Sequence, residues 1–323
     1  MLRVVAVSVA SLAAITLITR WRRSQEAVHA RWVRAVGFRS FAAEVEVAVE
    51  LALQCGAAMR KMSSAQATLK DGGGERAGID PVTATDEANE NLVTQTLARR
   101  FPAHEIIGEE AAAALGRVPP IPQKTPTWIV DPIDGTQNFV HGLPLSVVSI
   151  GLCVDGEPTL GVVYDPYLDE LFVGIADEGA YLNGRRLQVD GCTTLETAMV
   201  LTDVGYERSA EGVRKMSAGF SSLLEANTFA VRLIGSSVLA LTWVAAGRAS
   251  AFYAGFGKKD CPKPWDWCAA CAIGKACGVT FRRLESDAPF DITSSSCIVA
   301  STPELAGALA QVLRKHLRAV VQK

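Results

Sequence analysis

The segment Trp128–Phe139 constrains the fold most, because an apolar run stops there at two carboxylates. Its first residues, Trp128–Val130, indicate a buried strand. Pro132 cannot continue a central hydrogen-bond ladder, so we expect the strand to end before it. Asp131 and Asp134 would then leave the carboxyl end of the strand in a tight turn and face one point. The segment therefore predicts a pair of hard oxygen ligands at a strand end.

The next two residues give this turn a phosphate-binding character. Gly135 lets the backbone approach a ligand closely, and Thr136 can cap the helical turn that follows. N–H groups at the start of such a turn could hold phosphate oxygens beside a metal on the aspartates. The alternative is a plain strand followed by a type I turn, since Asp, Pro and Gly are residues that turns prefer.

Two further acidic segments favour the metal interpretation. Upstream, the apolar run Ile106–Gly108 ends in Glu109 and Glu110, and downstream Pro264–Asp266 opens a long stretch of small residues. Carboxylates, carbonyls and waters are the ligands that Mg²⁺ takes in proteins. Three separated acidic ends of strands or helices therefore suit a magnesium site.

With these residues in place, the chain resembles the inositol monophosphatase-like phosphatases over roughly residues 42–320. That family carries, in order, V-T-x-x-D, G-E-E, W-x-x-D-P-I-D-G-T-x-N-F and a late W-D. In this chain the four motifs are Val82–Asp86, Gly108–Glu110, Trp128–Phe139 and Trp265–Asp266. Four matching motifs in the same order leave little room for chance.

The resemblance implies an α+β fold, the layered αβαβα sandwich of that family. It also implies a Mg²⁺-dependent phosphomonoesterase that acts on a small phosphorylated polyol, with inositol monophosphate as the default substrate. The implied ligands of one Mg²⁺ are Glu109, Asp131 and the Ile133 carbonyl, and those of a second are Asp131, Asp134 and Asp266. A homodimer and inhibition by lithium are expected as well.

The same resemblance implies roles for further residues. Asp86 would accept a hydrogen bond from Thr136 and orient it toward the attacking water, with Glu109 as the third catalytic residue. A helix cap alone is the alternative for Asp86. Glu110 is expected behind the metal ligands, or as a plain surface acid. Substrate contacts are expected from Gly135, Thr136, Asp134, Asp266, Gly235 and Ser236.

The chain departs from the family at the substrate end. Ala254 stands where inositol-specific members have a glutamate that binds ring hydroxyls, so we expect a gap in the pocket there, and the segment 255–263 is longer than usual. Because that segment adds Lys258, Lys259 and Lys263, we expect a pocket mouth that becomes positive and favours a second anionic group on the substrate. Solvated lysines that point away are the alternative. A phosphatase of histidinol phosphate, fructose bisphosphate or a nucleotide bisphosphate stays open, as does a non-catalytic binding protein.

Composition bounds the class of protein. The 323 residues are 49% hydrophobic and 20% charged, as in ordinary globular proteins, and the formal net charge of -2 argues against nucleic-acid binding. We therefore expect one catalytic domain, residues 41–323, after an N-terminal segment of residues 1–40.

That N-terminal segment predicts targeting or anchoring, since it holds seven arginines and a single acid, Glu26. Residues 4–19 are uncharged but slightly short for a membrane-spanning helix. A membrane anchor with the catalytic domain in the cytosol is the first expectation, and a mitochondrial or plastid transit sequence is the alternative. A secretory signal peptide is disfavoured, because no clear small-residue cleavage site precedes Arg20–Arg23.

The eight cysteines are scattered through the sequence and predict reduced thiols packed as small apolar groups. Cys268-x-x-Cys271, with Cys261 and Cys277 nearby, also permits a zinc or redox site. Positions three apart share one helix face, so we expect Cys268 and Cys271 to be buried on a helix.

The remaining periodicity indicates helices mixed with short strands. Helices are expected at 41–62, from Thr83 or Thr85 to about Arg100, and at 212–225, 236–246, 266–277 and 303–318. Strands are expected at 145–154, 159–164, 170–175, 179–189, 198–201, 230–233, 249–253, 278–281 and 297–300. The strands up to residue 189 should form an antiparallel sheet, with Asn183–Gly184 in a tight hairpin turn.

Overall fold

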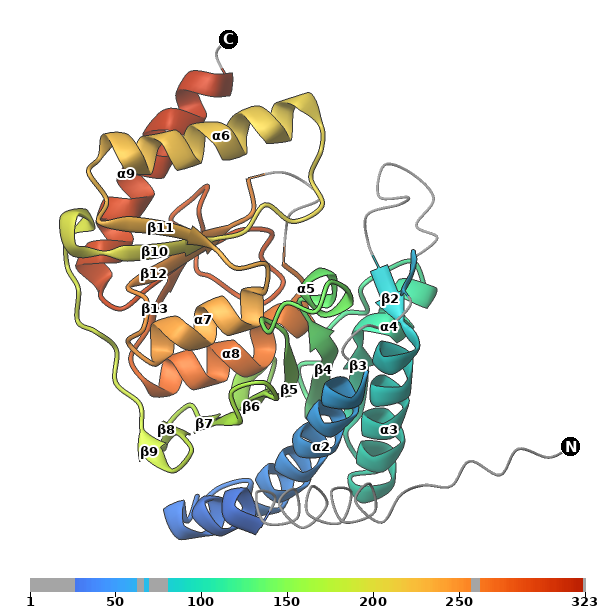
Figure 1. The fold of residues 1–323 in the computed structure, drawn as a ribbon. Coiled ribbons are helices and arrows are strands. Elements are labelled where there is room, and N and C mark those ends of the chain that lie inside the picture. The colour runs from blue at the N-terminus through green and yellow to red at the C-terminus, as the bar shows by residue number, and fades with distance from the viewer. Residues whose placement is uncertain (1–26, 63–66, 70–80, 257–261, 322–323) are drawn as a thin grey trace, which may run out of the picture.

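A computed structural model of the chain describes residues 27–62, 67–69, 81–256 and 262–321. Two large β-sheets alternate with three pairs of helices (Figure 1). The chain builds the first sheet and its outer helices before it builds the second sheet, as the blue-to-red colouring shows. The site described below lies where the two halves meet.

Seven strands form the first large sheet, in the order β3 (Glu105–Gly108), β4 (Thr127–Asp134), β5 (Val147–Val154), β6 (Glu157–Asp165), β7 (Glu170–Ile175), β8 (Gly179–Leu182) and β9 (Arg185–Arg186). β3 and β4 are parallel, and β4 pairs antiparallel with β5. The strands from β5 to β9 also pair antiparallel, as the sequence predicts. Asn183 and Gly184 both have positive φ in the β8–β9 turn, which confirms the predicted hairpin.

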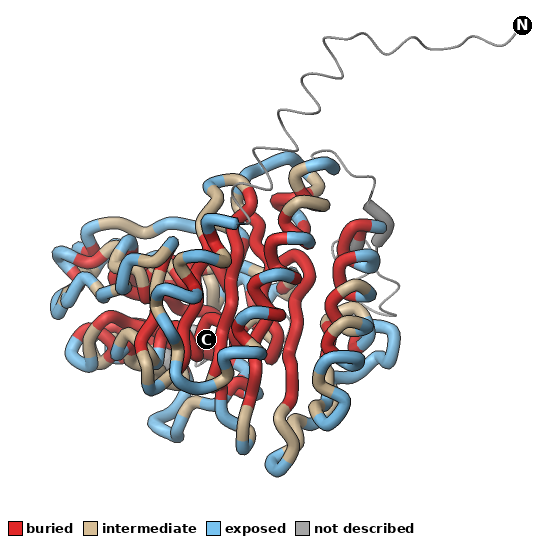
Figure 2. Tube along the Cα trace, turned by 90° about the horizontal axis from the view of Figure 1, so that it is seen from below, coloured by how far each residue is buried: buried red, intermediate tan, exposed pale blue. Residues whose placement is uncertain are grey.

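Two long helices, α2 (Ala42–Lys61) and α3 (Ala84–Arg100), cover one face of this sheet. α3 begins after Thr83, whose side chain accepts hydrogen bonds from the backbone N–H groups of Thr85 and Asp86 in a capping box. The helices and the sheet enclose an apolar core, and Figure 2 shows buried residues in red along both. Both helices therefore match their predicted ranges.

The other face of the first sheet packs on α7 (Ser237–Ala245) and α8 (Pro264–Ala276). Beyond them lies the second large sheet, in the order β11 (Ala230–Leu233), β10 (Met199–Thr202), β12 (Ala251–Ala254), β14 (Cys297–Ala300) and β13 (Thr280–Arg282). α6 (Ala210–Glu225) and α9 (Pro303–Val321) form the outermost layer (Figure 1). This order of layers confirms the predicted α+β fold and its αβαβα sandwich.

Short elements complete the chain between these layers. They are β1 (Ala67–Leu69) and β2 (Pro81–Thr83), which pair antiparallel, α4 (Glu109–Ala114), α5 (Thr136–Val140) and the 3-10 turn η1 (Leu195–Thr197). α4 and α5 directly follow β3 and β4 in sequence. Both helices therefore start where the acidic motifs stand.

Residues 27–36, which we expected to belong to the N-terminal segment, form a helix that packs on the catalytic domain. His29 is 2% exposed, and its Nε2 lies 2.9 Å from Oδ1 of Asp169. The indole Nε1 of Trp32 donates to Nδ1 of the same histidine at 3.1 Å. The packed part of the chain thus begins upstream of residue 41.

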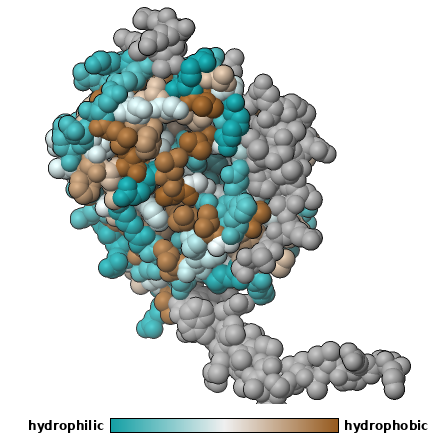
Figure 3. Space-filling model, turned by 45° about the horizontal axis from the view of Figure 1, so that its top comes forward, coloured by the Kyte–Doolittle hydropathy of each residue, from teal (hydrophilic) through white to brown (hydrophobic). Residues whose placement is uncertain are grey.

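The described surface has patches of apolar side chains among hydrophilic ones (Figure 3). Across the described ranges, no helix is both long enough and apolar enough to cross a membrane. The expected anchor, residues 4–19, lies outside those ranges.

Candidate active site

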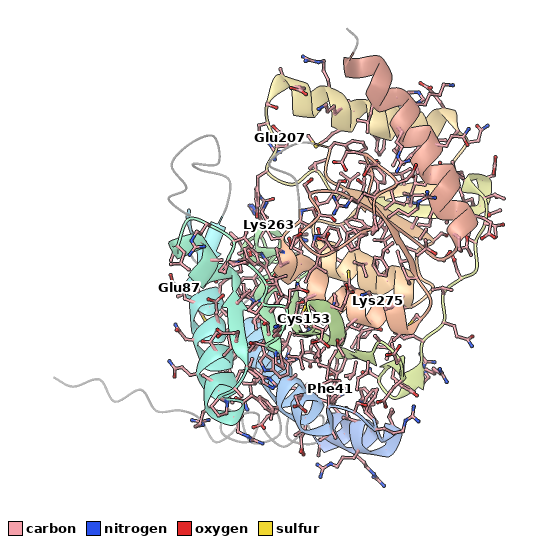
Figure 4. The ribbon with its side chains drawn as sticks, turned by 180° about the vertical axis from the view of Figure 1, so that it is seen from behind. Phe41, Glu87, Cys153, Glu207, Lys263 and Lys275 are labelled. Atoms are coloured by element: carbon pink, nitrogen blue, oxygen red, sulfur yellow. The ribbon has the colours of Figure 1, made fainter. Side chains whose placement is uncertain are left out.

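A cavity of about 730 Å³ lies where β4, α4, α5, the loop after β10 and the start of α8 meet. Figure 4 shows Glu87 on the α3 side of this region and Lys263 at the start of α8. The expected site residues that line the cavity are Glu109, Asp131, Ile133, Asp134, Gly135, Thr136, Gly235 and Asp266. The two others, Asp86 and Ser236, are buried behind its wall.

The carboxylates of Asp131 and Asp134 meet because β4 contains an irregularity. Asp131 pairs with Ser149 and Asp134 with Val147, so three steps along β4 match two along β5. In a regular strand, residues an odd number of positions apart point to opposite faces. One extra residue in β4 lets both carboxylates reach the same cavity.

The prediction that Pro132 ends the strand is therefore wrong. β4 continues through Asp134, and the proline lies inside the irregular stretch. Proline lacks an N–H and is tolerated at bulges, where the ladder is already interrupted. The irregular stretch of β4, rather than a turn after the strand, thus brings the carboxylates of Asp131 and Asp134 to the same cavity.

Asp266 joins the pair from the first turn of α8. Asp131, Asp134 and Asp266 each offer one carboxylate oxygen, and these three atoms all lie within 4.8 Å of one another. The backbone N–H of Lys263 donates to Oδ2 of Asp266 at 2.5 Å, which fixes the carboxyl group at the helix start. The three aspartates form a group that could hold a metal ion.

Glu109 and Ile133 lie beside this group. Glu109 is the first residue of α4, and its carboxyl group hydrogen-bonds with Asp131. The N–H of Ile133 donates to Oδ1 of Asp131 at 3.0 Å, and its carbonyl accepts from the Thr136 hydroxyl at 3.0 Å. The carbonyl that the resemblance assigns to a metal therefore lies at the same point as the acids.

Thr136 and Asp86 lie close enough to interact. The Thr136 hydroxyl lies 3.4 Å from Oδ1 of Asp86, and its single hydrogen can go either there or to the Ile133 carbonyl. Oδ2 of Asp86 accepts from the backbone N–H of Thr83 at 2.9 Å and from its hydroxyl. Asp86 therefore caps α3 and faces Thr136 at once, so both interpretations of this residue have structural support.

Ser236 lies in a different place from the one expected of a substrate contact. It is 2% exposed, caps α7 by accepting from the N–H of Leu239 at 3.2 Å, and donates its hydroxyl to Oδ2 of Asp134. The N–H of Val238 donates to the same oxygen at 3.1 Å. Ser236 thus orients a carboxylate, while its neighbour Gly235 lines the cavity.

Crowding of the acids changes their ionisation. Burial, followed by the charges of nearby acids, raises the pKa of Asp131 and of Asp266 well above the usual carboxyl range. Burial also raises the pKa of Asp134 to about 7, although hydrogen bonds from Ser236 and Val238 oppose that shift. A divalent cation would stabilise the charged carboxylates, and hard oxygen donors are what Mg²⁺ prefers. The residues present therefore fit magnesium.

Asp203 is a cavity residue that the sequence did not single out. It follows β10 directly, lines the cavity, and its charge contributes to the raised pKa of Asp134. Its position after the predicted strand 198–201 repeats the pattern of Asp131 after Val130. An acid at a strand end was the signal that could have revealed it.

The expected pocket mouth needs two corrections. Ala254 is 1% exposed and packs in the core between the sheets, so no gap opens to the cavity at its side chain. Lys263 does line the cavity, together with Arg117 and Arg208, but so do seven acids. The net charge of the described lining is therefore negative, and Lys258 and Lys259 lie outside the described residues.

The cysteines behave as packed thiols. Cys268 and Cys271 are buried on α8, and Sγ of Cys268 lies 3.5 Å from Sγ of Cys153. Burial raises the pKa of Cys268 and of Cys271, which disfavours the thiolate that zinc binding or redox chemistry requires. Cys261 lies outside the described residues, and among the described ones the only candidate metal group is the three aspartates.

Comparison with known proteins extends over most of the chain. A family model described as the inositol monophosphatase family matches residues 42–318. Inositol monophosphatase 1 of Solanum lycopersicum is 43% identical over 238 residues, which cover 73% of this chain and 83% of that protein. Inositol monophosphatase 2 of Homo sapiens is 39% identical over 269 residues, which cover 83% of this chain and 90% of that protein.

Solved structures agree with the sequence matches. The structure of inositol monophosphatase from Anabaena superposes with a TM-score of 0.69 at 28% identity, and covers 84% of this chain and 94% of its own. An extragenic suppressor protein from Bartonella henselae gives a TM-score of 0.72 at 26% identity, with 84% and 99% covered.

Proposed function

The chain belongs to the inositol monophosphatase family, whose members are phosphoric monoester hydrolases, and from this premise we propose that it hydrolyses inositol monophosphate to inositol and phosphate with Mg²⁺. The observation that carries the proposal is the group formed by Asp131, Asp134 and Asp266 at the wall of a cavity that Thr136 also lines. A binding protein that had merely kept the fold would have no need for buried acids that repel one another.

We assign the metal to five groups of this chain. Glu109, Asp131 and the Ile133 carbonyl would hold one Mg²⁺, and Asp131, Asp134 and Asp266 a second. When bound, magnesium supplies a water of lowered pKa and neutralises charge on the phosphate oxygens. Asp131 belongs to both sets, so we expect it to be the ligand that the chain can least lose.

The protein's own groups would orient the reactants. The Thr136 hydroxyl, held by Asp86, would fix the direction of the attacking water, since a hydroxyl needs a fixed acceptor to set its orientation. The N–H groups of Gly135 and Thr136 stand at the start of α5, where a helix has no acceptors of its own for them, and would hold phosphate oxygens. Ser236 would keep the Asp134 carboxylate facing the cavity.

The experiment is a phosphate-release assay over a panel of esters. With Mg²⁺, kcat/KM should be highest for inositol monophosphate and lower for fructose bisphosphate, histidinol phosphate and a nucleotide bisphosphate. If kcat/KM were highest for one of the other three esters, that ester rather than inositol monophosphate would be the substrate. No turnover of any ester would refute the enzymatic role.

We also propose that residues 4–19 attach the protein to a membrane with the catalytic domain in the cytosol, and that the protein is a homodimer. The apolar composition of residues 4–19 supports the first proposal, and the apolar surface patches are compatible with the second. Flotation of the full chain with vesicles and light scattering of the purified protein test them. Recovery of the protein inside mitochondria or plastids would instead favour a transit sequence.

A further inference from the structure

Asp203 holds a carboxylate oxygen at the cavity that no described residue uses. Its Oδ1 accepts from the N–H of Val204 at 2.7 Å and from the N–H of Gly205 at 3.4 Å. Within the described part of the chain, Oδ2 of Asp203 accepts no hydrogen bond. The side chain is half-buried and lines the cavity, so this second oxygen is available to a ligand there.

Strand geometry places Asp203 relative to the core. Residues two apart in a strand point to the same face of the sheet. Ala254 therefore lies on the same face as Phe252, and Asp203 follows Leu201 by the same two positions. Leu201 and Phe252 are strand partners and belong, with Ala254, to the core between the sheets. Asp203 is the first residue after β10 and lines the cavity, so it lies at the edge of this core next to the acidic group.

Asp203 stands apart from the metal-type acids. It is not one of the three aspartates whose oxygens lie within 4.8 Å of one another, although its charge acts on Asp134. Its loop is also held in place, because the Arg208 guanidinium donates to the carbonyls of Gly205 at 3.1 Å and Glu207 at 2.7 Å. The structure thus presents a fixed acceptor next to, rather than within, the acidic group.

We propose that Asp203 accepts hydrogen bonds from hydroxyl groups of the alcohol part of the substrate and thereby selects polyol phosphates. This inference rests on the proposed phosphatase function. A carboxylate with an uncommitted oxygen suits a neutral hydroxyl donor, whereas it repels a second anionic group. The side chain of Ala254 on the neighbouring strand does not line the cavity, so within the described lining we assign the selectivity for hydroxyls to Asp203. A site with such an acceptor discriminates against esters that lack the hydroxyl.

The test is Asp203→Asn, assayed with inositol 1-phosphate and with phenyl phosphate, whose alcohol carries no further hydroxyl. The amide keeps an oxygen for Val204 and Gly205 but replaces the other acceptor by a donor. We expect kcat/KM for the inositol ester to fall about 10- to 100-fold, the effect of one hydrogen bond to a charged group, mainly through KM. For phenyl phosphate the change should stay within about threefold, because that ester makes no such bond.

Glu87→Gln is the matched control, since it makes the same change at an exposed acid that borders the cavity. It should leave both esters unaffected. The rise in Tm that Mg²⁺ produces should be the same in wild type and in Asp203→Asn, because Asp203 is not a metal ligand in this proposal.

Three outcomes would overturn the inference. Equal losses of kcat/KM on both esters would place Asp203 in the catalytic machinery, and unchanged kcat/KM on both would show that it contacts no substrate. A wild-type protein that hydrolyses phenyl phosphate as efficiently as inositol 1-phosphate would show that hydroxyls are not selected. The absence of hydrolysis of either ester with Mg²⁺ would instead refute the phosphatase function itself.

Discussion

Replacing Glu90 with alanine should weaken Mg²⁺ binding although this residue touches no expected metal position. Glu90 lies on α3, is 6% exposed, and its two carboxylate oxygens accept from the backbone N–H groups of Glu110 and Ala111, each at 2.8 Å. These N–H groups belong to the first turn of α4, where a helix leaves its donors unsatisfied. Glu90 therefore anchors the helix whose first residue is Glu109.

The magnitude follows from the two bonds. A hydrogen bond to a charged group contributes about 1.5–3 kcal/mol, and Ala112 is the only buried residue of α4. If the free energy of one such bond is needed to keep Glu109 beside Asp131, its loss weakens Mg²⁺ binding about tenfold. We therefore expect the Mg²⁺ concentration for half-maximal activity to rise about tenfold in Glu90→Ala.

Gly108→Ala is a second perturbation of the same contact. A Cβ at position 108 would lie 2.4 Å from the carboxyl carbon of Glu90, so the methyl group displaces the carboxylate without removing it. This variant should shift the Mg²⁺ dependence in the same direction. Combining it with Glu90→Ala should add little, since both changes remove one interaction.

The assay is a Mg²⁺ titration, read both as phosphate release and as the rise in Tm with added Mg²⁺, which does not depend on turnover. Glu87→Gln, on the same helix but exposed, is the control and should match wild type. Suppose Glu90→Ala lowers Tm but leaves the Mg²⁺ dependence unchanged. The anchoring of α4 would then concern stability alone, and the reasoning would be refuted.

Three other predictions concern the acidic group itself. Asp131→Asn should lower turnover far more than tenfold while the circular dichroism spectrum persists, because one side chain serves both expected metals; a variant that keeps a tenth of wild-type turnover would contradict the shared role. Lithium at millimolar concentration should inhibit phosphate release by occupying the position defined by Asp134 and Asp266, and insensitivity would count against that position. Burial raises the pKa of Asp134 from 3.8 to about 7. The folded metal-free protein therefore holds the proton on the Asp134 carboxyl group more tightly than the unfolded chain does. The free energy of unfolding should fall as pH rises across that range. Urea unfolding in chelator should show this decline, Mg²⁺ should suppress it, and Asp134→Asn should reduce it; an equal slope in that variant would assign the decline to other groups.

Sequence patterns predicted the elements whose signals are local. The helix from Ala84 to Arg100 is expected because Thr83 or Thr85 can cap its start, and the structure shows that Thr83 does so in a capping box with Asp86, three residues along the chain. The β8–β9 hairpin was expected because Asn183 and Gly184 tolerate positive φ. In both cases, the residues that make the structure are neighbours in the sequence.

Sequence patterns failed where the outcome depends on distant segments. A proline after an apolar run suggests a strand end, and only the pairing of β4 with β5 shows that Pro132 lies within the ladder. Asp203 is one acid among many until the order of strands in the second sheet brings it to the cavity. The expected gap at Ala254 failed for the same reason, because the packing between the sheets decides which way that side chain faces.

The irregularity in β4 also means that one segment has two possible alignments with its neighbour. Ile129 belongs to the core shared with α7 and α8, whereas Val130 and Ile133 belong to the core beneath α2 and α3. In a straight alignment Ile133 would change sides, and the Asp134 carboxylate would enter the apolar layer beneath α2 and α3. Pro132 cannot supply an N–H to the straight hydrogen-bond ladder, so it disfavours the straight alignment and favours the irregular one. With glycine or alanine at position 132, we expect β4 to populate a second conformation. In that conformation the carboxylates of Asp131 and Asp134 would lie on opposite faces of the sheet.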